Sequence, residues 1–352
     1  LQFSSSEVAS WLSAPAASSR HFPLFEIVLY LAYQTLGGTG LMILKAGFAA
    51  ALGALLFLFC SQRQGYAVAA LMTFLALLTL SPLLTLRSES VSFLMLLLLL
   101  ILLHRQAQTS ELTWWPFALL TLIWANLDGW VILGPLAVGC YGIASMVRGQ
   151  RESARQFGRL FLITFLASLC SLNHIRPWID FAFWRSSASR LPSIYALPEW
   201  FQSTKYAPIL AFLVLLLVGL RTLAKRGRDA FSPLLLLSIL FLVLSFLNPL
   251  FIGFFALAMA PFFSAERDED FVEGSLSRWG TAFLGLLLVV ASWPGWLQGK
   301  PWGRREWSLS HDSSLQEAMD WIEKRKKEHP ETRALTVSPS VVDYQKWFAP
   351  SS

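Results

Sequence analysis

Few side chains in this sequence could do chemistry, and those that could lie between long apolar runs. The clearest candidate is Asp128, in the stretch 124–130 (WANLDGW). A carboxylate between two apolar segments could act as a general base or as a ligand of a metal ion. Equally, Asp128 could cap the helix that follows, because a short acceptor side chain satisfies the free amide groups of a first turn. The residue types leave both interpretations open.

Arg87 is a candidate for binding phosphate. It ends the stretch 81–87 (SPLLTLR), in which Pro82 is expected to break a helix near the membrane surface. A guanidinium group can hold a phosphate through two parallel hydrogen bonds. The alternative is an Arg side chain that extends to lipid headgroups, or that pairs with Glu89 or Asp128.

Three further residues complete the set of candidates. His174 and Arg176 lie in the stretch 173–178 (NHIRPW), where they could bind an anion or transfer a proton. A loop histidine can equally be solvated without a role. Glu26 lies on the otherwise apolar run 25–33 (FEIVLYLAY), where an ionised carboxylate is costly unless it faces water or a partner. Glu26 is therefore a second candidate acid or base.

Signatures of other sites are absent from the sequence, which contains no P-loop, no GxSxG, no HExxH and no CxxC motif. Cys60, Cys140 and Cys170 lie in or at the end of apolar runs, which predicts core packing and neither a disulfide framework nor a metal site. The net charge is +6, and the basic residues lie in short loops between apolar runs. That pattern favours membrane orientation over nucleic-acid binding.

The composition determines which elements position these residues. Of the 352 residues, 55% are hydrophobic and only 14% are charged, and the mean hydropathy is +0.53. Soluble domains carry about 25% charged residues, so this chain lacks the polar side chains that a soluble surface needs. The composition excludes a soluble enzyme, a disordered chain and a secreted disulfide scaffold. It predicts an all-α polytopic membrane protein.

About ten apolar runs are candidate transmembrane helices, since a spanning helix needs about 20 mostly apolar residues. They cover Leu41–Cys60, Tyr66–Leu84, Val91–His104, Trp115–Ala125, Trp130–Val147, Arg159–Leu172, Ala207–Leu220, Phe231–Leu247, Phe251–Phe263 and Thr281–Trp293. The preceding run Phe22–Leu36 is short, carries Glu26 and Gln34, and stops at the stretch 37–40 (GGTG). We expect this run to lie on the membrane surface as an interfacial helix.

The distribution of Lys and Arg predicts the orientation of the helices, because short cytoplasmic loops are rich in basic residues. Two basic stretches, 148–159 and 221–228, fall on the same side of a ten-helix bundle. We expect this side to be cytoplasmic. Asp128, Arg87 and the loop that holds His174 then face outward.

We expect three parts in the chain. Residues 1–40 form an outer-face segment with the interfacial helix and without a signal peptide, residues 41–293 form the transmembrane domain, and residues 294–352 form an outer-face soluble tail. In the tail, the stretch 314–317 (SLQE) has the spacing of a capping box, and Ala334–Val337 has the pattern of a strand. These features predict the start of a small α/β domain that is cut short at the end of the chain.

The order of several motifs resembles a bacterial family of uncharacterised multi-pass membrane proteins. That family is similar to the membrane-embedded GT-C glycosyltransferases of the lipid-A and arabinose transferase type. The block 124–130 is the most specific part of the resemblance, which covers most of 22–350. The other matching positions are Phe25-Glu26, Tyr33, Gly37-Gly38-Thr39-Gly40-Leu41, Lys45, Ser81-Pro82, Arg87, Ser92-Phe93, Leu172-Asn173, Ser338-Pro339, Asp343-Tyr344 and Trp347-Phe348-Ala349-Pro350.

The resemblance implies a transferase that takes a sugar from a polyprenyl-phosphate donor at the outer face of the bacterial inner membrane. In such enzymes an acid in the first outer loop acts on the acceptor hydroxyl. An Arg or Lys, and in some members a divalent metal ion, holds the lipid phosphate. Carried over to this chain, the acid or base is Glu26 or Asp128, and the lipid phosphate is bound by Arg87, Arg176 and His174.

The sequence departs from the family pattern at one place and so leaves a second hypothesis. Only Glu7 and Glu26 precede Leu41, and they form no acidic pair. The alternative to a transferase is a non-catalytic membrane scaffold or lipid-binding protein. A transporter is the third hypothesis, and it is disfavoured because we find no inverted repeat and no deeply placed charge apart from Lys45. Membrane lipids and a lipid-linked sugar are the expected partners, whereas the sequence sets no oligomeric state.

Overall fold

A computed structural model of the chain describes residues 23–62, 65–84, 88–109, 111–170, 178, 196–203, 206–226, 231–262, 324 and 328. This part of the chain is mostly helical, and no strand occurs in it. The chain divides into two compact units, residues 1–305 and 306–352. The helices described below all belong to the first unit. The expected span Thr281–Trp293 and the tail with its expected strand Ala334–Val337 lie outside the described ranges, apart from two helical residues, Lys324 and Glu328.

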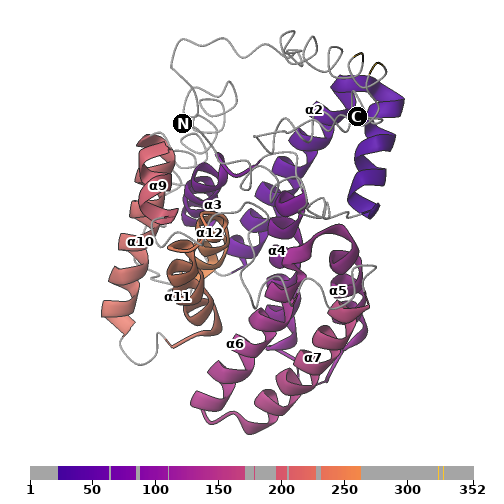
Figure 1. Ribbon diagram of the computed structural model, residues 1–352. Helices are drawn as coiled ribbons and strands as arrows, with labels where there is room; N and C mark the ends of the chain where they lie inside the picture. Colours follow the sequence, from indigo (N-terminus) through magenta and orange to yellow (C-terminus); the bar gives the residue numbers. More distant parts are fainter. Residues whose placement is uncertain are drawn as a thin grey trace, which may run out of the picture. The chain divides into compact units, whose positions relative to one another are not determined.

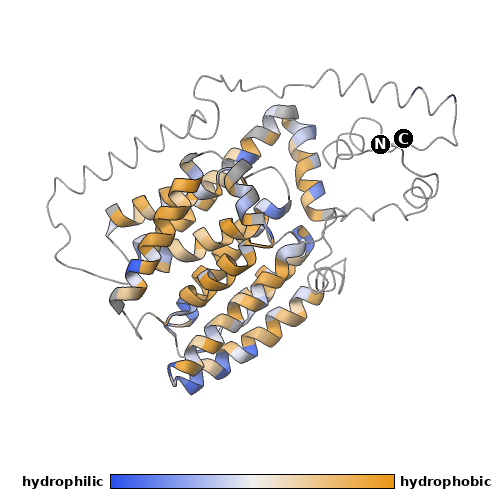
Figure 2. Cartoon of the chain, turned by 60° about the vertical axis from the view of Figure 1, so that its left-hand side comes forward, coloured by the Kyte–Doolittle hydropathy of each residue, from blue (hydrophilic) through white to orange (hydrophobic). Residues whose placement is uncertain are grey.

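The helices follow the apolar runs of the sequence (Figure 1). Hydrophobic residues extend along them, and hydrophilic residues gather mainly at their ends (Figure 2). In chain order the elements are α2 Pro23–Ser61, α3 Tyr66–Leu80, α4 Ser88–Gln106, α5 Trp115–Leu127, η1 Gly129–Ile132, α6 Leu133–Val147, α7 Arg151–Leu169, α9 Ala196–Ser203, α10 Tyr206–Arg226, α11 Pro233–Ser245 and α12 Leu250–Phe262.

Four stretches are long and apolar enough to cross a membrane: Thr39–Ser61, Ser88–Gln106, Gly129–Val147 and Ala207–Ala224. The helices α3, α5, α11 and α12 are apolar but shorter. Apolar side chains also cover part of the outside. On α10, Leu210, Leu213, Leu217 and Leu220 lie on one helical face and are 39–64% exposed. The helical fold class is thus confirmed, and these apolar helices are consistent with a membrane protein; the count of about ten spans stays a prediction.

A kink divides α2 at Gly37, where the expected glycine-rich turn falls. Gly37 has φ 60° and ψ −147°, a backbone conformation that side chains disfavour. A Cβ atom on Gly40 would lie 2.1 Å from the carbonyl oxygen of Ala32, so only glycine permits this close approach. Before the kink the helix exposes apolar side chains such as Tyr30 and Leu31. This exposure suits the interfacial position that the sequence predicts.

The helix α7 begins earlier than the expected span Arg159–Leu172 and ends at Leu169. Its buried residues Phe157, Leu160, Thr164 and Ser168 follow a helical spacing that continues through both halves. On the outside, Arg151, Arg155 and Arg159 are exposed. The basic stretch is therefore the amphipathic start of the helix and not a separate loop, because its apolar face already packs against α6 and α5.

The core of the first unit is built around α12. From Phe251 to Phe262 every residue of this helix is buried, and it packs against α3, α10 and α11. A helix that is apolar on all sides is stable only where neighbours cover it completely. Gly253 allows the closest approach: a Cβ atom there would lie 2.6 Å from Cε1 of Phe93 and 2.7 Å from Cδ2 of Leu80.

We expect Gly253→Ala to destabilise the protein by about 1–3 kcal/mol, because Phe93 and Leu80 are fully buried and must shift to admit the methyl group. The measurement is the melting temperature in detergent. Gly139→Ala is the matched control, since a Cβ there meets Phe161 at an ordinary 3.7 Å. Equal melting temperatures for the two variants would contradict the tight contact at Gly253.

Candidate functional site

Asp128 lies in the turn between α5 and η1, and its side chain is only 2% exposed. Its carboxylate accepts a hydrogen bond from the hydroxyl group of Ser92 on α4. Ser92 in turn accepts a hydrogen bond of 2.7 Å from Nε1 of Trp124 on α5. Ser92 and Trp124 are fully buried. The three side chains therefore form one chain of hydrogen bonds that joins α4 to the end of α5.

Local sequence explains how these groups meet. Trp124 is one helical turn before Asp128, and the amide of Asp128 donates to the carbonyl of Trp124 at 2.9 Å, so both residues lie on one face where α5 ends. Asp128 then takes an extended conformation, with φ −159° and ψ 153°, before η1 begins. On α4, Ser88 and Ser92 are spaced by one turn and point to the same side.

The structure separates the two interpretations that the sequence left open for Asp128. As the residue before η1 it occupies the N-cap position, but its side chain makes no cap hydrogen bond with that helix. The carboxylate reaches across to α4 instead. The hydrogen bond of the carboxylate thus links the end of α5 to α4. Capping of η1 does not explain why this position holds an acid.

Burial raises the pKa of Asp128 from 3.8 to about 7, because the charged form loses its hydration. The hydrogen bond from Ser92 lowers the pKa of Asp128, and the nearby charge of Glu89 raises it further. Ser88 and the amide of Gly129 lower this pKa more weakly. Asp128 lies between the apolar helices Trp115–Leu127 and Gly129–Val147 and outside both. A carboxyl group of this kind holds its proton for about half the time near neutral pH.

Glu26 comes from an element that meets the same end of α4 and α5. It is exposed in the first turn of α2. The neighbouring Phe25 is buried against Val91 of α4, and Leu127 packs against the same cluster. The apolar contact thus places the turn of Glu26 beside the elements that carry Ser92 and Asp128. Arg87, His174 and Arg176 lie outside the described residues, so their phosphate-binding roles stay predictions.

Sequence reasoning does not identify two members of the hydrogen-bond chain, Ser92 and Trp124, as functional residues. The signal that could have found Ser92 is its spacing from Ser88 at the start of an otherwise apolar run, since polar groups buried among apolar helices need a partner. Within the described residues, no three His, Cys, Asp or Glu side chains are grouped so that they could hold a metal ion.

Comparisons with known proteins add no assignment: no family model matches the chain, and neither a curated protein nor a solved structure matches it. The inference about function therefore depends on the geometry around Asp128 and on the resemblance of the sequence motifs.

The stability of the folded protein should fall as the pH rises from about 4 to about 7. Over this range the unfolded chain has released the proton of Asp128, whereas the folded protein still holds it, because its pKa is raised from 3.8 to about 7. The full effect is of order 4 kcal/mol. The measurement is the melting temperature in detergent across this range.

Asp128→Asn should remove this part of the pH dependence, because an amide does not titrate and its oxygen can still accept from Ser92. Glu111→Gln is the control, as it replaces one exposed carboxyl group by an amide in the same way. If wild type and Asp128→Asn show the same slope between pH 4 and 7, the raised pKa of Asp128 is wrong.

Proposed function

We propose that this chain is a GT-C-like membrane glycosyltransferase that moves a sugar from a polyprenyl-phosphate donor at the outer face of the bacterial inner membrane. The observation that carries the proposal is the buried, hydrogen-bonded carboxyl group of Asp128 at the end of α5. An intramembrane or interfacial acid is costly, so its presence favours a functional site. The resemblance of the block 124–130 to the family motif supports the same conclusion.

The proposed chemistry needs a group that takes a proton from the acceptor hydroxyl. The hydroxyl oxygen bonds to the anomeric carbon of the sugar as the bond from that carbon to the phosphate oxygen breaks, and the polyprenyl phosphate leaves with the electron pair. Asp128, with a pKa of about 7, can accept this proton and release it later at neutral pH. Ser92 orients the carboxylate. Glu26 on the adjacent turn of α2 is the second candidate for the same role.

The departing phosphate needs cationic donors, for which the sequence offers Arg87, Arg176 and His174. We propose that these residues bind the polyprenyl phosphate at the outer ends of the helices. Arg87 directly precedes Ser88, the first residue of α4, and Ser92 one turn later hydrogen-bonds Asp128, so the order of the chain supports a role for Arg87 near the acid. A divalent metal ion is an alternative counter-charge to the phosphate.

A second candidate function is a non-catalytic scaffold or lipid-binding protein. The observation that favours it is the near-complete burial of Asp128, whose carboxylate joins two helices as a structural bond would. In that case the acid serves only the packing of α4 against α5. The two candidates differ in what they predict for a variant that keeps the fold.

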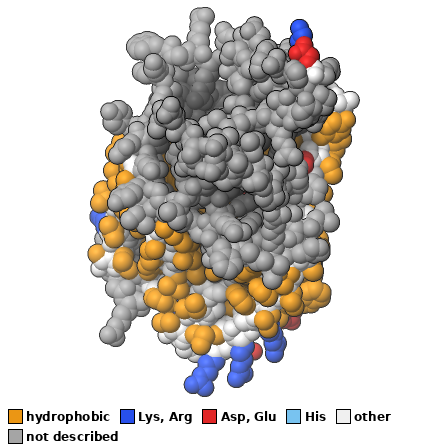
Figure 3. Space-filling model, in the orientation of Figure 1, with side chains coloured by type: hydrophobic (Ala, Val, Ile, Leu, Met, Phe, Trp, Pro, Cys, Tyr) orange, Lys and Arg blue, Asp and Glu red, His pale blue; other side chains and the backbone are white. Residues whose placement is uncertain are grey.

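The proposed topology has about ten spans, the basic turn between α6 and α7 in the cytoplasm, and the C-terminal tail on the outer side. The basic residues at this turn support the orientation, since Arg148, Arg151 and Arg155 are all exposed. Lys and Arg side chains project from the lower edge of the molecule in Figure 3.

Photo-crosslinking with a labelled polyprenyl phosphate tests the phosphate site in the full chain. We expect Arg87→Ala to lower specific labelling about tenfold, because a charge-assisted bidentate contact is lost. Arg105→Ala is the matched control, because it removes one positive charge from an exposed residue in the last turn of α4. Equal labelling of Arg87→Ala and wild type would remove Arg87 from the site.

The glycan and lipid profile of the native host's envelope separates the two candidate functions. We expect Asp128→Asn to abolish the modification while the variant is still made and melts within a few degrees of wild type. A folded Asp128→Asn variant with an unchanged profile would favour the scaffold and end the assignment of Asp128 as acid or base. Glu26→Gln, measured beside it, shows which of the two acids acts.

A further inference from the structure

The structure contains a second polar site at the other end of α6 from Asp128. A cavity of about 140 Å³ lies there, well above the ~15 Å³ that one water needs. It is formed by the turn between α6 and α7, by Ala107 just after α4, and by Pro233 at the start of α11. We propose that this cavity binds the phosphate headgroup of an anionic membrane lipid. The proposal is independent of the transferase assignment, because it concerns a different end of the helices.

The turn between α6 and α7 joins a closed helix end to a helix start that has no side-chain cap. Gly149 has φ 74°, and the amides of Gly149 and Gln150 donate to the carbonyls of Met146 and Ser145 at 3.0 and 2.9 Å, which is a Schellman ending of α6. Then α7 begins, and Gln150 at its N-cap makes no side-chain cap hydrogen bond. The amide of Arg151 donates to the carbonyl of Gly149 at 3.0 Å, whereas the next amides of α7 receive no hydrogen bond from the Gln150 side chain. A helix start without a side-chain cap attracts an anion.

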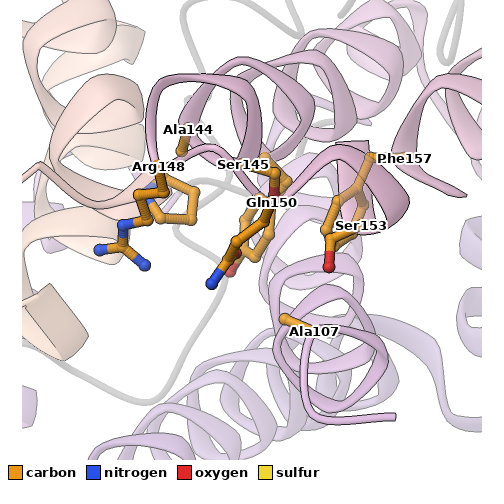
Figure 4. Close-up of a pocket in the computed structure, with 9 residues that line it drawn as sticks. Ala107, Ala144, Ser145, Arg148, Gln150, Ser153 and Phe157 are labelled. Carbon is orange, nitrogen blue, oxygen red and sulfur yellow. The ribbon is translucent and has the colours of Figure 1, made fainter. Parts of the chain in front are cut away.

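An independent observation is the side chain of Ser145, which lines the cavity. Ser145 is 6% exposed, and its hydroxyl group makes no hydrogen bond to another described side chain. Because this hydroxyl group is open to the cavity, it is available to donate a hydrogen bond to a ligand there. In Figure 4, Ser145, Gln150 and Ser153 lie between the turn and Ala107. These groups can donate hydrogen bonds to phosphate oxygens.

Charge at the site favours an anion. Arg148 lines the cavity, and its Nε atom donates to the carbonyl of Phe231 at 3.0 Å, which fixes the side chain beside α11. Arg151 and Arg155 are exposed on the first turns of α7. Glu152, also exposed, is the acid in that first turn and does not line the cavity. The turn therefore presents a net positive charge to a ligand.

Apolar side chains beside the turn indicate that the anion is attached to a lipid. Ile143, Met146 and Val147, on the last turns of α6, are 52%, 70% and 62% exposed. Acyl chains can lie against these side chains while the phosphate enters the polar cavity. The Gly129–Val147 stretch is long enough to span a membrane, so its end falls at the depth of lipid headgroups. A free phosphate would gain nothing from this apolar surface.

The test is native mass spectrometry of the purified full chain, titrated with phosphatidic acid and, separately, with diacylglycerol of the same acyl chains. We expect phosphatidic acid to bind and diacylglycerol not to bind. Ser145→Ala should weaken phosphatidic acid about tenfold, which is the loss expected for one hydrogen bond to a charged group. This variant should fold as wild type does, because the hydroxyl group bonds to no described residue. Unchanged binding to Ser145→Ala, or equal binding of diacylglycerol, would overturn the proposal.

Two controls separate a defined site from general attraction between charges. Arg148→Gln should weaken phosphatidic acid more than Arg155→Gln, since only Arg148 lines the cavity although both carry the same charge on the same turn region. An equal effect of the two variants would contradict a built site. Inorganic phosphate is the third probe: if it binds as tightly as phosphatidic acid, the ligand is free phosphate and the lipid assignment is wrong.

Discussion

Burial of a carboxyl group is the constraint on which the arrangement at one end of the helices depends. Asp128 is almost completely removed from solvent, and an ionisable group there is tolerated only when hydrogen bonds compensate for the lost hydration. Ser92 supplies that bond, and Trp124 orients Ser92. Because the three residues come from two helices, α4 and α5 must meet at this level.

The helix α6 links two ends with different chemistry. Before its start lies the carboxyl group of Asp128, whose pKa is about 7. After its end lies a turn that exposes Arg148, Arg151 and Arg155. With η1 it covers 19 residues, or about 28 Å of helix, which is close to the thickness of the hydrocarbon layer. One end of α6 thus carries a titratable acid, and the other end carries exposed cationic side chains. This asymmetry is expected of a membrane protein with a fixed orientation.

Between these ends the molecule is held together by close apolar packing. The buried helix α12 supplies the centre, and rings such as Phe93 and Phe254, with centroids 4.7 Å apart, fill the space between helices. The outward-facing leucines of α10 show that apolar surface is also left uncovered. Such a surface suits contact with lipid, where helix association depends on packing and small residues such as Gly253.

Much of this was determined by the sequence alone. Apolar runs predicted nearly all of the described helices, since a hydrocarbon environment forces the backbone to satisfy its own hydrogen bonds. The glycines after residue 36 likewise predicted the kink in α2. The partner of Asp128 could not be predicted, because Ser92 is 36 residues away and only helix packing brings the two together. The same holds for the pKa of Asp128 and for the place of Ser145 in the cavity: both depend on which neighbours surround the side chain, and that is decided by the tertiary structure.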